Sequence, residues 1–356
     1  MTPARSRHCD QATVWESGTA LNGWPSWDED IPDGVVTMRL RALALAVCLV
    51  SAGCASQPAA APQTAQSAVT VDNCGKQIAF DRVPQRVVGY YQHPTEIMIA
   101  LGLRDKLIGM AYPDNDPLPR YAADYRSVPR ISDKDASFEQ VLAKSPDLVY
   151  GGYDSAFEDK SGRSRDTFAG AGIKTYLSRE ACLDRAVTMD DVYEELRTVG
   201  GIFQVPDRAD ALIADMKASI TRTTQRLTGA EPLKVFVYDS GEATAYTAAG
   251  TGIGTEIIKL AGGRNVFADV QKDWADVSWE QVLQRSPDLI VVYDYFGTPA
   301  PDKKIELLLS KPELANVPAI RNRRFARLTL QDTVLGVRAP YAVETLAAQV
   351  HPDRTP

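Results

Sequence analysis

The sequence predicts an α/β fold with two Rossmann-like, three-layer lobes that are joined by a single long helix. Three observations lead to this prediction: a segment that occurs twice, an alternation of strand-like and helix-like segments in both halves of the chain, and a long helical stretch between the halves. The chain has 356 residues, of which 44% are hydrophobic, and this is enough to form two cores of ordinary size.

The duplicated segment is the strongest signal in the chain. The sequence DASFEQVLAKSPDLVY begins at Asp135, and DVSWEQVLQRSPDLIV begins at Asp276; ten of the sixteen aligned positions are identical. One copy lies in each half of the chain, and this favours two similar lobes over one continuous domain.

Each copy of this segment predicts a helix, a turn and a strand. A Ser followed three residues later by Gln has the spacing of a capping box, so helices are expected to begin at Ser137 and Ser278. Pro146 and Pro287 end these helices, and the apolar run that follows each Pro is typical of a buried strand.

Strands alternate with helices in both predicted lobes, and this alternation indicates mainly parallel sheets. The N-terminal lobe is expected to cover residues 71–187 and the C-terminal lobe residues 231–351. Between them, residues 188–230 are almost wholly helical, with a break just before Pro206. A helix over about residues 206–228 has apolar residues spaced for one buried stripe, so we expect a stiff strut between the lobes.

Residues 1–53 are interpreted as a doubtful leader followed by a lipoprotein signal peptide. From Met38 the chain reads MRLRALALAVCLVSAGC, a basic start and an apolar run too short to span a membrane, so Met38 is the expected true start. Small residues directly before Cys54 resemble a bacterial lipobox, in which that Cys carries the lipid; simple cleavage near Ala55 is the alternative. Residues 54–70, rich in Pro, Ala and Gln, are expected to form a flexible tether.

The body of the protein contains two cysteines, Cys74 and Cys182. In an exported protein they are expected to form a disulfide, which would tie the start of the N-terminal lobe to the loop where that lobe ends. The alternative is that both are unpaired small residues of the core.

Several classes of function are disfavoured by the sequence. The net charge is −7 and no basic stripe is present, so nucleic acid is not an expected partner. The segment GTGIGTE has the spacing of neither a phosphate loop nor a dinucleotide fingerprint. The body has only His93 and His351, which disfavours a bare metal site and a Ser-His-Asp triad, and Ser240 lacks nucleophile-elbow flanks. We therefore do not expect an enzyme.

The lipobox, the tether, the two lobes, the strut and the duplicated SxEQVLxxSPDL together resemble the helical-backbone class of ABC-transporter substrate-binding proteins, the iron-siderophore and vitamin B12 receptor family. The segments TEIMIALGL, AGGRNVF at Ala261 and DWADVSWEQVL also look like landmarks of this family. The likeness covers nearly everything from Val71 to His351. It implies an ABC permease and its ATPase subunits as partners, a membrane attachment through a lipid anchor, and a monomer.

The resemblance also implies two residues that dock onto the permease. In this family an exposed Glu on each lobe meets arginines of the permease, and the matching positions are Glu139 and Glu280, one in each copy of the repeat. One carboxylate on each lobe would let a roughly two-fold permease hold both lobes through charge-assisted pairs. The alternative is that each Glu only stabilises a helix N-terminus.

The ligand is expected between the lobes, where the loops that follow the carboxyl ends of the strands face each other. Tyr and Trp offer large rigid faces with one polar tip, which suits a bulky chelate. By analogy with the vitamin B12 receptor, Tyr112 and Trp274 align with ligand-contacting aromatic residues. The expected ligand-binding residues are Tyr91, Tyr112, Tyr153, Tyr246, Trp274, Tyr293, Tyr295 and Arg338.

Arg338, in the segment GVRAP, looks like the basic residue that several family members place before the final helix to meet an anionic or carbonyl-bearing ligand. Arg163 and Arg165 are the other arginines considered for such a role, but a solvated loop is the favoured interpretation for both.

Four further residues carry expectations about burial. Tyr90 and Phe296 are the aromatic residues at strand ends that are most expected to pack in the core. His93 is expected to be solvated in a loop, and His351 to lie in a frayed C-terminal tail.

The resemblance therefore implies a receptor that binds an iron(III) siderophore and delivers it to an ABC permease, either at the outer face of the cell membrane or in the periplasm. Iron would arrive as a chelate, with no metal bound directly. Cobalamin or haem is the alternative ligand, and a structural or signalling lipoprotein is the alternative from another class. The aromatic-rich, arginine-poor cleft favours a near-neutral hydroxamate, and the strut predicts a small rocking motion.

Overall fold

The structure is a computed structural model that describes residues 68–354. The predicted signal peptide, the predicted lipidation site Cys54 and nearly all of the predicted tether lie outside the described residues. Within the described part of the chain, no helix is both long enough and apolar enough to cross a membrane.

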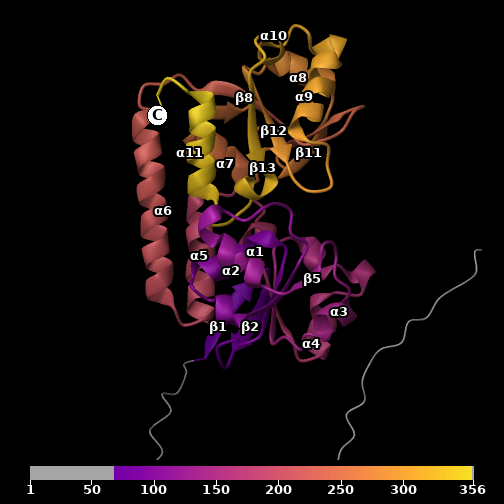
Figure 1. Ribbon diagram of the computed structural model, residues 1–356, viewed down its shortest axis with the longest axis vertical. Coiled ribbons are helices and arrows are strands. Elements are labelled where there is room, and N and C mark those ends of the chain that lie inside the picture. Colours follow the sequence, from indigo (N-terminus) through magenta and orange to yellow (C-terminus); the bar gives the residue numbers. More distant parts are fainter. Residues whose placement is uncertain (1–67, 355–356) are drawn as a thin grey trace, which may run out of the picture. The chain divides into compact units, whose positions relative to one another are not determined.

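The N-terminal lobe is built on a five-stranded sheet whose strands are all parallel (Figure 1). The strand order is β5-β4-β3-β6-β7, so β3, the first of these strands in the chain, lies at the centre. An antiparallel hairpin of β1 and β2 precedes the sheet. The strands are β1 (Val69–Asn73), β2 (Lys76–Phe80), β3 (Val87–Tyr90), β4 (Leu107–Ala111), β5 (Arg130–Ser132), β6 (Leu148–Gly151) and β7 (Lys174–Leu177).

Helices cover both faces of this sheet. Because successive residues of a strand point to opposite faces, Val87 packs in one core with Ile97 of α1, whereas Val88 packs in another with Val141 of α3 and Phe168 of α4. This is the predicted three-layer arrangement. The α-helices of the lobe are α1 (Gln92–Ala100), α2 (Ala122–Ser127), α3 (Phe138–Leu142) and α4 (Arg165–Gly170).

Two helices connect the lobes, α5 (Met189–Ile202) and α6 (Pro206–Arg226). Pro206 is the first residue of α6, where its missing N–H costs no helical hydrogen bond. One stripe of α6 is buried, and it includes Ala209, Ile213 and Met216. Figure 1 shows α6 running along the side of both lobes beside α11 (Ala339–Val350). The predicted strut is confirmed, while the limits drawn for the lobes stay a prediction.

The C-terminal lobe contains a four-stranded parallel sheet with the order β10-β8-β12-β13. A separate two-stranded antiparallel sheet of β9 and β11 lies beside it. The strands are β8 (Leu233–Tyr238), β9 (Ala245–Ala248), β10 (Gly263–Asn265), β11 (Trp274–Val277), β12 (Leu289–Asp294) and β13 (Phe325–Thr329).

This second sheet also lies between two helical layers. Val291 of β12 packs on the side of α7 and α11, and its neighbours Ile290 and Val292 pack on the side of α8, α9 and α10. The predicted α/β class with two similar lobes is therefore confirmed. The remaining α-helices are α7 (Ile253–Leu260), α8 (Trp279–Arg285), α9 (Pro301–Ser310) and α10 (Pro318–Arg321).

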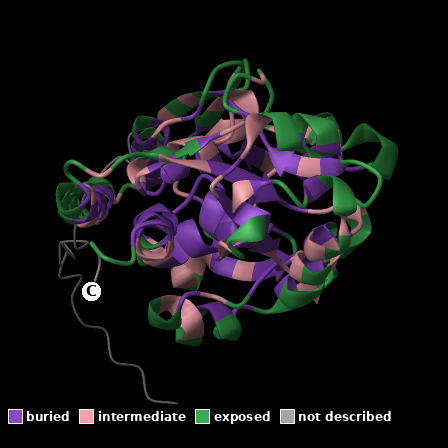
Figure 2. Cartoon of the chain, turned by 90° about the horizontal axis from the view of Figure 1, so that it is seen from above, coloured by how far each residue is buried: buried purple, intermediate pink, exposed green. Residues whose placement is uncertain are grey.

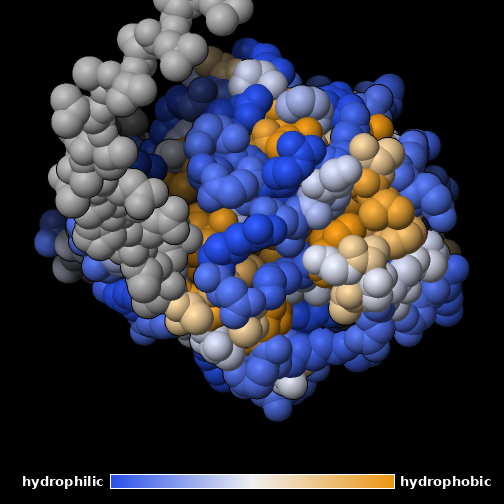
Figure 3. Space-filling view, turned by 90° about the horizontal axis from the view of Figure 1, so that it is seen from below, coloured by the Kyte–Doolittle hydropathy of each residue, from blue (hydrophilic) through white to orange (hydrophobic). Residues whose placement is uncertain are grey.

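One hydrophobic core runs through both lobes. It joins residues of the N-terminal sheet to residues of the C-terminal sheet by way of α5, α6 and α11. Figure 2 shows these buried segments at the centre of the described chain, with exposed segments at its edge. On the face seen from below, hydrophilic residues predominate and the hydrophobic ones form separate patches (Figure 3). The continuous core indicates that the lobes form one folded unit.

A disulfide joins Cys74 to Cys182, with the sulfurs 1.97 Å apart. It connects the turn of the β1–β2 hairpin to the short 3₁₀ helix η5 (Arg179–Cys182). Next to it, Asn73 exchanges side-chain hydrogen bonds with the backbone of Leu177. The disulfide predicted from the sequence is confirmed, and it anchors the loop that contains η5.

The two copies of the repeat have the same local structure. Each Ser caps its helix through the N–H of the Gln three residues later, and each Gln accepts the N–H of its Ser, so both capping boxes are formed. After each helix, Ser145 and Ser286 adopt a left-handed conformation with φ near +50°. This conformation ends a helix but is unfavourable for a residue with a Cβ atom.

The Asp of each SPDL sequence ties the repeat to the first strand of its lobe's parallel sheet. The carboxylate of Asp147 accepts the N–H groups of Gln85 and Arg86 just before β3, and that of Asp288 accepts the N–H of Lys234 in β8. These bonds explain why the Asp occurs in both copies.

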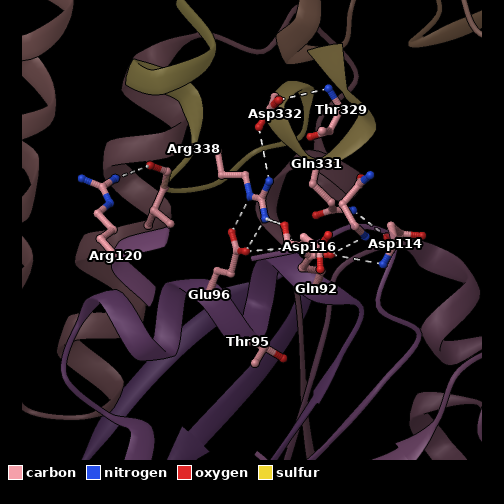
Figure 4. A network of polar contacts seen from close by, with 12 residues as sticks. Gln92, Thr95, Glu96, Asp114, Asp116, Arg120, Thr329, Gln331, Asp332 and Arg338 are labelled. Atoms are coloured by element: carbon pink, nitrogen blue, oxygen red, sulfur yellow. Dashed lines mark hydrogen bonds and ion pairs between the residues drawn. The ribbon is translucent and has the colours of Figure 1, made fainter. Parts of the chain in front are cut away.

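The lobes are held together by a buried ion pair between Arg338, which precedes α11, and Glu96 of α1 (Figure 4). Nη2 of Arg338 lies 2.6 Å from Oε1 of Glu96, and Nε lies 2.7 Å from Oε2. The same guanidinium bonds to Oδ1 of Asp332 at 3.3 Å and to the carbonyl O of Asp116 at 2.7 Å. Both side chains of the ion pair are at most 4% exposed.

Further hydrogen bonds cross between the lobes beside this ion pair. Gln331 donates to Oδ2 of Asp114 at 2.6 Å, Asn115 donates to the carbonyl O of Asp294, and the N–H of Phe296 donates to the carbonyl O of Asp114. Burial raises the pKa of Asp114 to about 7, although the hydrogen bond from Gln331 opposes this shift. The two lobes therefore meet across a polar interface as well as the shared core.

Replacing Ser145 by Gly should stabilise the protein by about 0.5–1 kcal/mol, because Gly adopts the left-handed conformation without strain. The backbone hydrogen bonds at this position do not involve the Ser side chain. The matched control is Ala143→Gly two residues earlier, where φ is −59° and Gly should destabilise by up to about 1 kcal/mol. Urea unfolding of both variants checks the prediction, and a loss of stability in S145G would contradict it.

Candidate functional site

A cleft of about 560 Å³ lies between the two lobes. Its N-terminal wall consists of residues 152–155, which directly follow β6, and of the loop around η5. Its C-terminal wall includes the end of β9, the start of α7 and the start of β11. Loops at the carboxyl ends of parallel strands are the usual place for a ligand site in such sheets. The cleft thus has the location that the sequence predicted.

Three predicted ligand residues form an aromatic cluster on the N-terminal lobe. Tyr91 lies 5.0 Å from Tyr112 and 4.8 Å from Tyr153, measured between ring centroids. Tyr153 lines the cleft, whereas Tyr91 and Tyr112 do not. Tyr91 and Tyr112 follow adjacent strands, and both have positive φ angles of 80° and 55°. Strain of this kind in non-glycine residues is concentrated at functional sites.

The C-terminal lobe contributes a second aromatic group. Trp274 stacks on Tyr246 with 5.4 Å between ring centroids and 12° between ring planes, and it meets Tyr293 edge-on at 5.9 Å. The antiparallel strands β9 and β11 carry Tyr246 and Trp274, whereas Tyr293 comes from β12. Trp274 and Tyr293 line the cleft. A partly exposed stacked pair of this kind offers a flat face to an apolar ligand surface.

Sequence reasoning missed the charged residues of the cleft. Asp154, Glu180, Asp184 and Asp273 line it together with two cationic side chains. The pKa of Asp154 is raised, first by desolvation and then by the negative charge of Asp273 on the opposite lobe. Carboxylates from both lobes therefore face one another across the cleft. They lie in loops without a sequence pattern, and only the fold brings them together.

Glu180 joins the two walls of the cleft. Its carboxylate accepts the N–H of Ile253 at the start of α7 (3.1 Å) and the N–H of Leu335 (2.9 Å). Burial raises its pKa, and these two hydrogen bonds oppose the shift. Because Glu180 belongs to η5, the disulfide at Cys182 also holds this bridge in place.

The cationic residues of the cleft are Arg185 and Lys272. The guanidinium of Arg185 already pairs with Asp191, at 2.6 Å and 2.8 Å. Lys272 is exposed at the rim. Little positive charge is thus left for an anionic ligand.

Five of the eight predicted ligand residues do not line the cleft: Tyr91, Tyr112, Tyr246, Tyr295 and Arg338. The guanidinium of Arg338 forms the buried ion pair with Glu96, so this residue lies in the interface between the lobes and does not reach the cleft. The hydroxyl of Tyr295 donates to Oδ2 of Asp239 at 3.2 Å, and its ring lies 5.0 Å from the ammonium group of Lys304.

Several expectations about burial were wrong. Phe296 was expected in the core but is 59% exposed, because it lies in a turn after β12; Tyr90, by contrast, is fully buried as expected. Arg163 and Arg165 were expected in a solvated loop. Arg163 is buried, and Arg165 bonds to Asn73 at 2.9 Å.

Both histidines were also misjudged. His93 belongs to α1 and is buried, and burial lowers its pKa to about 4. It packs so closely on Gly152 that a Cβ atom there would lie 2.4 Å from Nε2, which explains the glycine. His351 ends α11 in a buried position, with Nε2 2.9 Å from the carbonyl O of Gly262. In residues 68–354 no group of three or more His, Cys, Asp or Glu side chains is placed to hold a metal ion.

The two predicted docking residues have matching surroundings. Glu139 is the second residue of α3 and Glu280 is the second residue of α8, and both side chains are exposed. The hydroxyl of Ser137 donates to Glu139 at 2.7 Å. In both residues a hydrogen bond from the capping Ser lowers the pKa of the carboxyl group. Each lobe therefore presents one ionised carboxylate at the start of equivalent helices.

Comparisons with known proteins agree with this architecture. An ABC transporter substrate-binding lipoprotein of Bacillus subtilis is 26% identical over 80% of this chain and 86% of its own length. A vitamin B12-binding protein of Pectobacterium carotovorum is 29% identical over 59% of this chain and 71% of its own length. The crystal structure of a periplasmic binding protein from Veillonella parvula, 28% identical, covers 80% of this chain and 98% of its own with a TM-score of 0.74.

All three relatives are named as binding proteins and not as enzymes, and the one from Bacillus subtilis is named as part of an ABC transporter. The model of the periplasmic binding protein family matches residues 87–331, which include both parallel sheets and nearly the whole cleft. The chain therefore belongs to the periplasmic binding protein family.

Proposed function

We propose that this protein is the substrate-binding lipoprotein of an ABC importer and captures a ferric siderophore in the cleft between its lobes. The observation that carries the proposal is the cleft itself. It places Tyr153 of one lobe and Trp274, Tyr293 of the other around a space of about 560 Å³, in the range of small-molecule sites. Family membership and the substrate-binding lipoprotein of Bacillus subtilis support the transport role.

The charges of the cleft support a neutral or cationic hydroxamate chelate over a triply charged catecholate. Asp154 and Asp273 already raise the electrostatic cost of a negative ligand, and Arg185 is paired with Asp191. A solved structure titled as part of an Fe³⁺-hydroxamate transport system has the same fold, with a TM-score of 0.70. Cobalamin is the second candidate, because the vitamin B12-binding proteins are among the relatives and its corrin amides are also uncharged. Haem, which carries carboxylates, fits this cleft less well.

The protein is proposed to act as a monomer at the outer face of the cell membrane or in the periplasm. The lipid would be attached to Cys54, and residues 54–70 would separate the membrane from the body. The relative from Bacillus subtilis is named a lipoprotein, which supports this attachment. The permease and its ATPase subunits would be the partners, with Glu139 and Glu280 as the contacts.

Titration of the purified protein with ferrioxamine B, ferric citrate, cyanocobalamin and haemin tests the ligand class. Ferrioxamine B should bind and quench Trp fluorescence, and Trp274→Ala should weaken its binding about tenfold to a hundredfold, because an aromatic face contributes roughly 1.5–3 kcal/mol. Trp279→Phe is the matched control, since Trp279, the first residue of α8, is 5% exposed and packs in the core of the C-terminal lobe. Calorimetry that finds no tight binding of any of these chelates would favour a structural or signalling lipoprotein.

The permease contacts are tested by Glu139→Gln, Glu280→Gln and the double variant. Each single substitution should weaken binding to the reconstituted permease by about tenfold, more at low salt, because an ionised carboxylate facing arginine is lost. Binding of the chelate to the free protein should stay unchanged. The control is Glu313→Gln, an exposed glutamate outside the repeat. Full permease affinity of the double variant would refute the docking role.

A further inference from the structure

Arg163 is a buried arginine two residues before the start of helix α4. It is 4% exposed, and its guanidinium carbon lies 5.2 Å from the ring centroid of Tyr90. Nη1 donates to the carbonyl O of Ala136 at 3.1 Å, while Nη2 donates to the carbonyl O of Ser155 at 2.9 Å and to Oδ1 of Asp135 at 3.3 Å. One side chain thus joins two segments that are distant in the sequence.

Stability alone does not account for this arginine. Its Nε is buried and has no hydrogen-bond partner, and its carboxylate partner Asp135 is 54% exposed, so water weakens the ion pair. Replacement of a whole buried ion pair by apolar side chains of similar volume is often neutral or stabilising, so a partly buried pair such as this one is weak evidence for a role in stability. The role of Arg163 is therefore sought in the two segments that its guanidinium connects, and not in the stability of the core.

On one side, Arg163 holds the wall of the cleft. Ser155, whose carbonyl it binds, lines the cleft, and its Oγ lies 2.7 Å from the hydroxyl of Tyr91. Tyr91 in turn contacts Tyr112 and Tyr153. The carbonyl and the hydroxyl of Ser155 therefore link Arg163 to the whole aromatic cluster of the N-terminal lobe.

On the other side, Arg163 holds the start of the docking helix. Ala136 directly precedes Ser137, the N-cap of α3, and α3 carries Glu139. The hydroxyl of Tyr90 supports the same point, since it donates to the carbonyl O of Ala136 at 3.1 Å and accepts the N–H of Ala136 at 2.9 Å. Movement of this carbonyl would move the first turn of α3.

In the C-terminal lobe, the chain itself makes the equivalent connection. Strand β11 begins at Trp274 in the cleft and ends at Val277, and the next residue, Ser278, caps the helix that carries Glu280. In the N-terminal lobe, residues 152–155 follow α3 in the chain, beyond β6, so no strand leads from the cleft into the docking helix. In this lobe the side chain of Arg163 makes the connection between the cleft and the helix.

We propose that Arg163 couples the N-terminal half of the cleft to the docking helix α3, as β11 couples the C-terminal half to α8. The use of this coupling in transport rests on the proposed function, whereas the link itself does not depend on the ligand. A ligand that displaces the Ser155 carbonyl changes the N-cap of α3 through the guanidinium. By reciprocity, binding of Glu139 to the permease changes the affinity of the cleft for its ligand.

A double-mutant cycle in the ligand-free, full-length protein tests the link. Ser155→Gly keeps the carbonyl group that Arg163 binds but removes the hydroxyl that holds Ser155 to Tyr91. The loosened cleft wall should speed hydrogen exchange of the α3 amides of Gln140, Val141 and Ala143 by up to about fivefold, the factor that the loss of one hydrogen bond carries. In an Arg163→Met background, the same substitution should leave these amides unchanged. Equal acceleration in both backgrounds, or none in either, would overturn the proposal.

Arg165→Met is the matched control, because Arg165 binds Asn73 and Thr175 and touches neither the cleft nor α3. It should leave the acceleration by Ser155→Gly intact. Arg163→Lys keeps the charge but cannot bind two carbonyl groups in the fork geometry of arginine, so it should be uncoupled like the Met variant. Full coupling in the Lys variant would show that charge alone suffices and would contradict the proposal.

A second arm uses ferrioxamine B at saturation. It should slow exchange of the α3 amides in the wild type and in Arg165→Met but not in Arg163→Met, and the α8 amides should slow in all three. If ferrioxamine B does not bind the wild type, the proposed ligand class fails, and the ligand-free cycle still decides the coupling. If ferrioxamine B binds without any effect on α3, the coupling fails and the proposed function stands.

Discussion

The buried ion pair between Arg338 and Glu96 is the constraint on which the geometry of the cleft depends. Its partners come from different lobes, 242 residues apart in the sequence, and both are almost inaccessible to water. Removal of one partner would leave the other as a buried, unpaired charge, which costs about 3–5 kcal/mol. Together with the shared core along α5, α6 and α11, this pair holds the two cleft walls at a fixed separation.

The rest of the site follows from that fixed separation. The parallel sheets direct the ends of β6 and β12 to the same crevice, so Tyr153 and Tyr293 face it without any movement of the lobes. Glu180 then closes one end by accepting backbone N–H groups of the other lobe, and the disulfide at Cys182 keeps it there. The small rocking motion expected from the sequence stays a prediction.

Local features of this protein could be predicted from the sequence, and long-range features could not. The capping boxes at Ser137 and Ser278, the start of α6 at Pro206 and the disulfide depend on short patterns or on simple counting, and all were correct. The burial of Arg338, by contrast, depends on which surfaces of the two lobes meet. No local pattern distinguishes an arginine that faces a ligand from one that faces a buried glutamate.

The same reason explains the other errors. His93 was misplaced because α1 begins earlier than the PTEIMIALGL pattern indicates, so the histidine lies inside the helix and against Gly152. Arg163 was misplaced because its partners, Ala136 and Ser155, are separated in the chain by α3 and β6 and meet only after folding.

The distance between spin labels at Lys134 and Glu313, one on each lobe, tests the central claim most directly, with cysteines outside the disulfide replaced by serine. The account predicts one narrow distribution that broadens in Glu96→Gln; a broad distribution in the wild type, or an unchanged one in the variant, would contradict it.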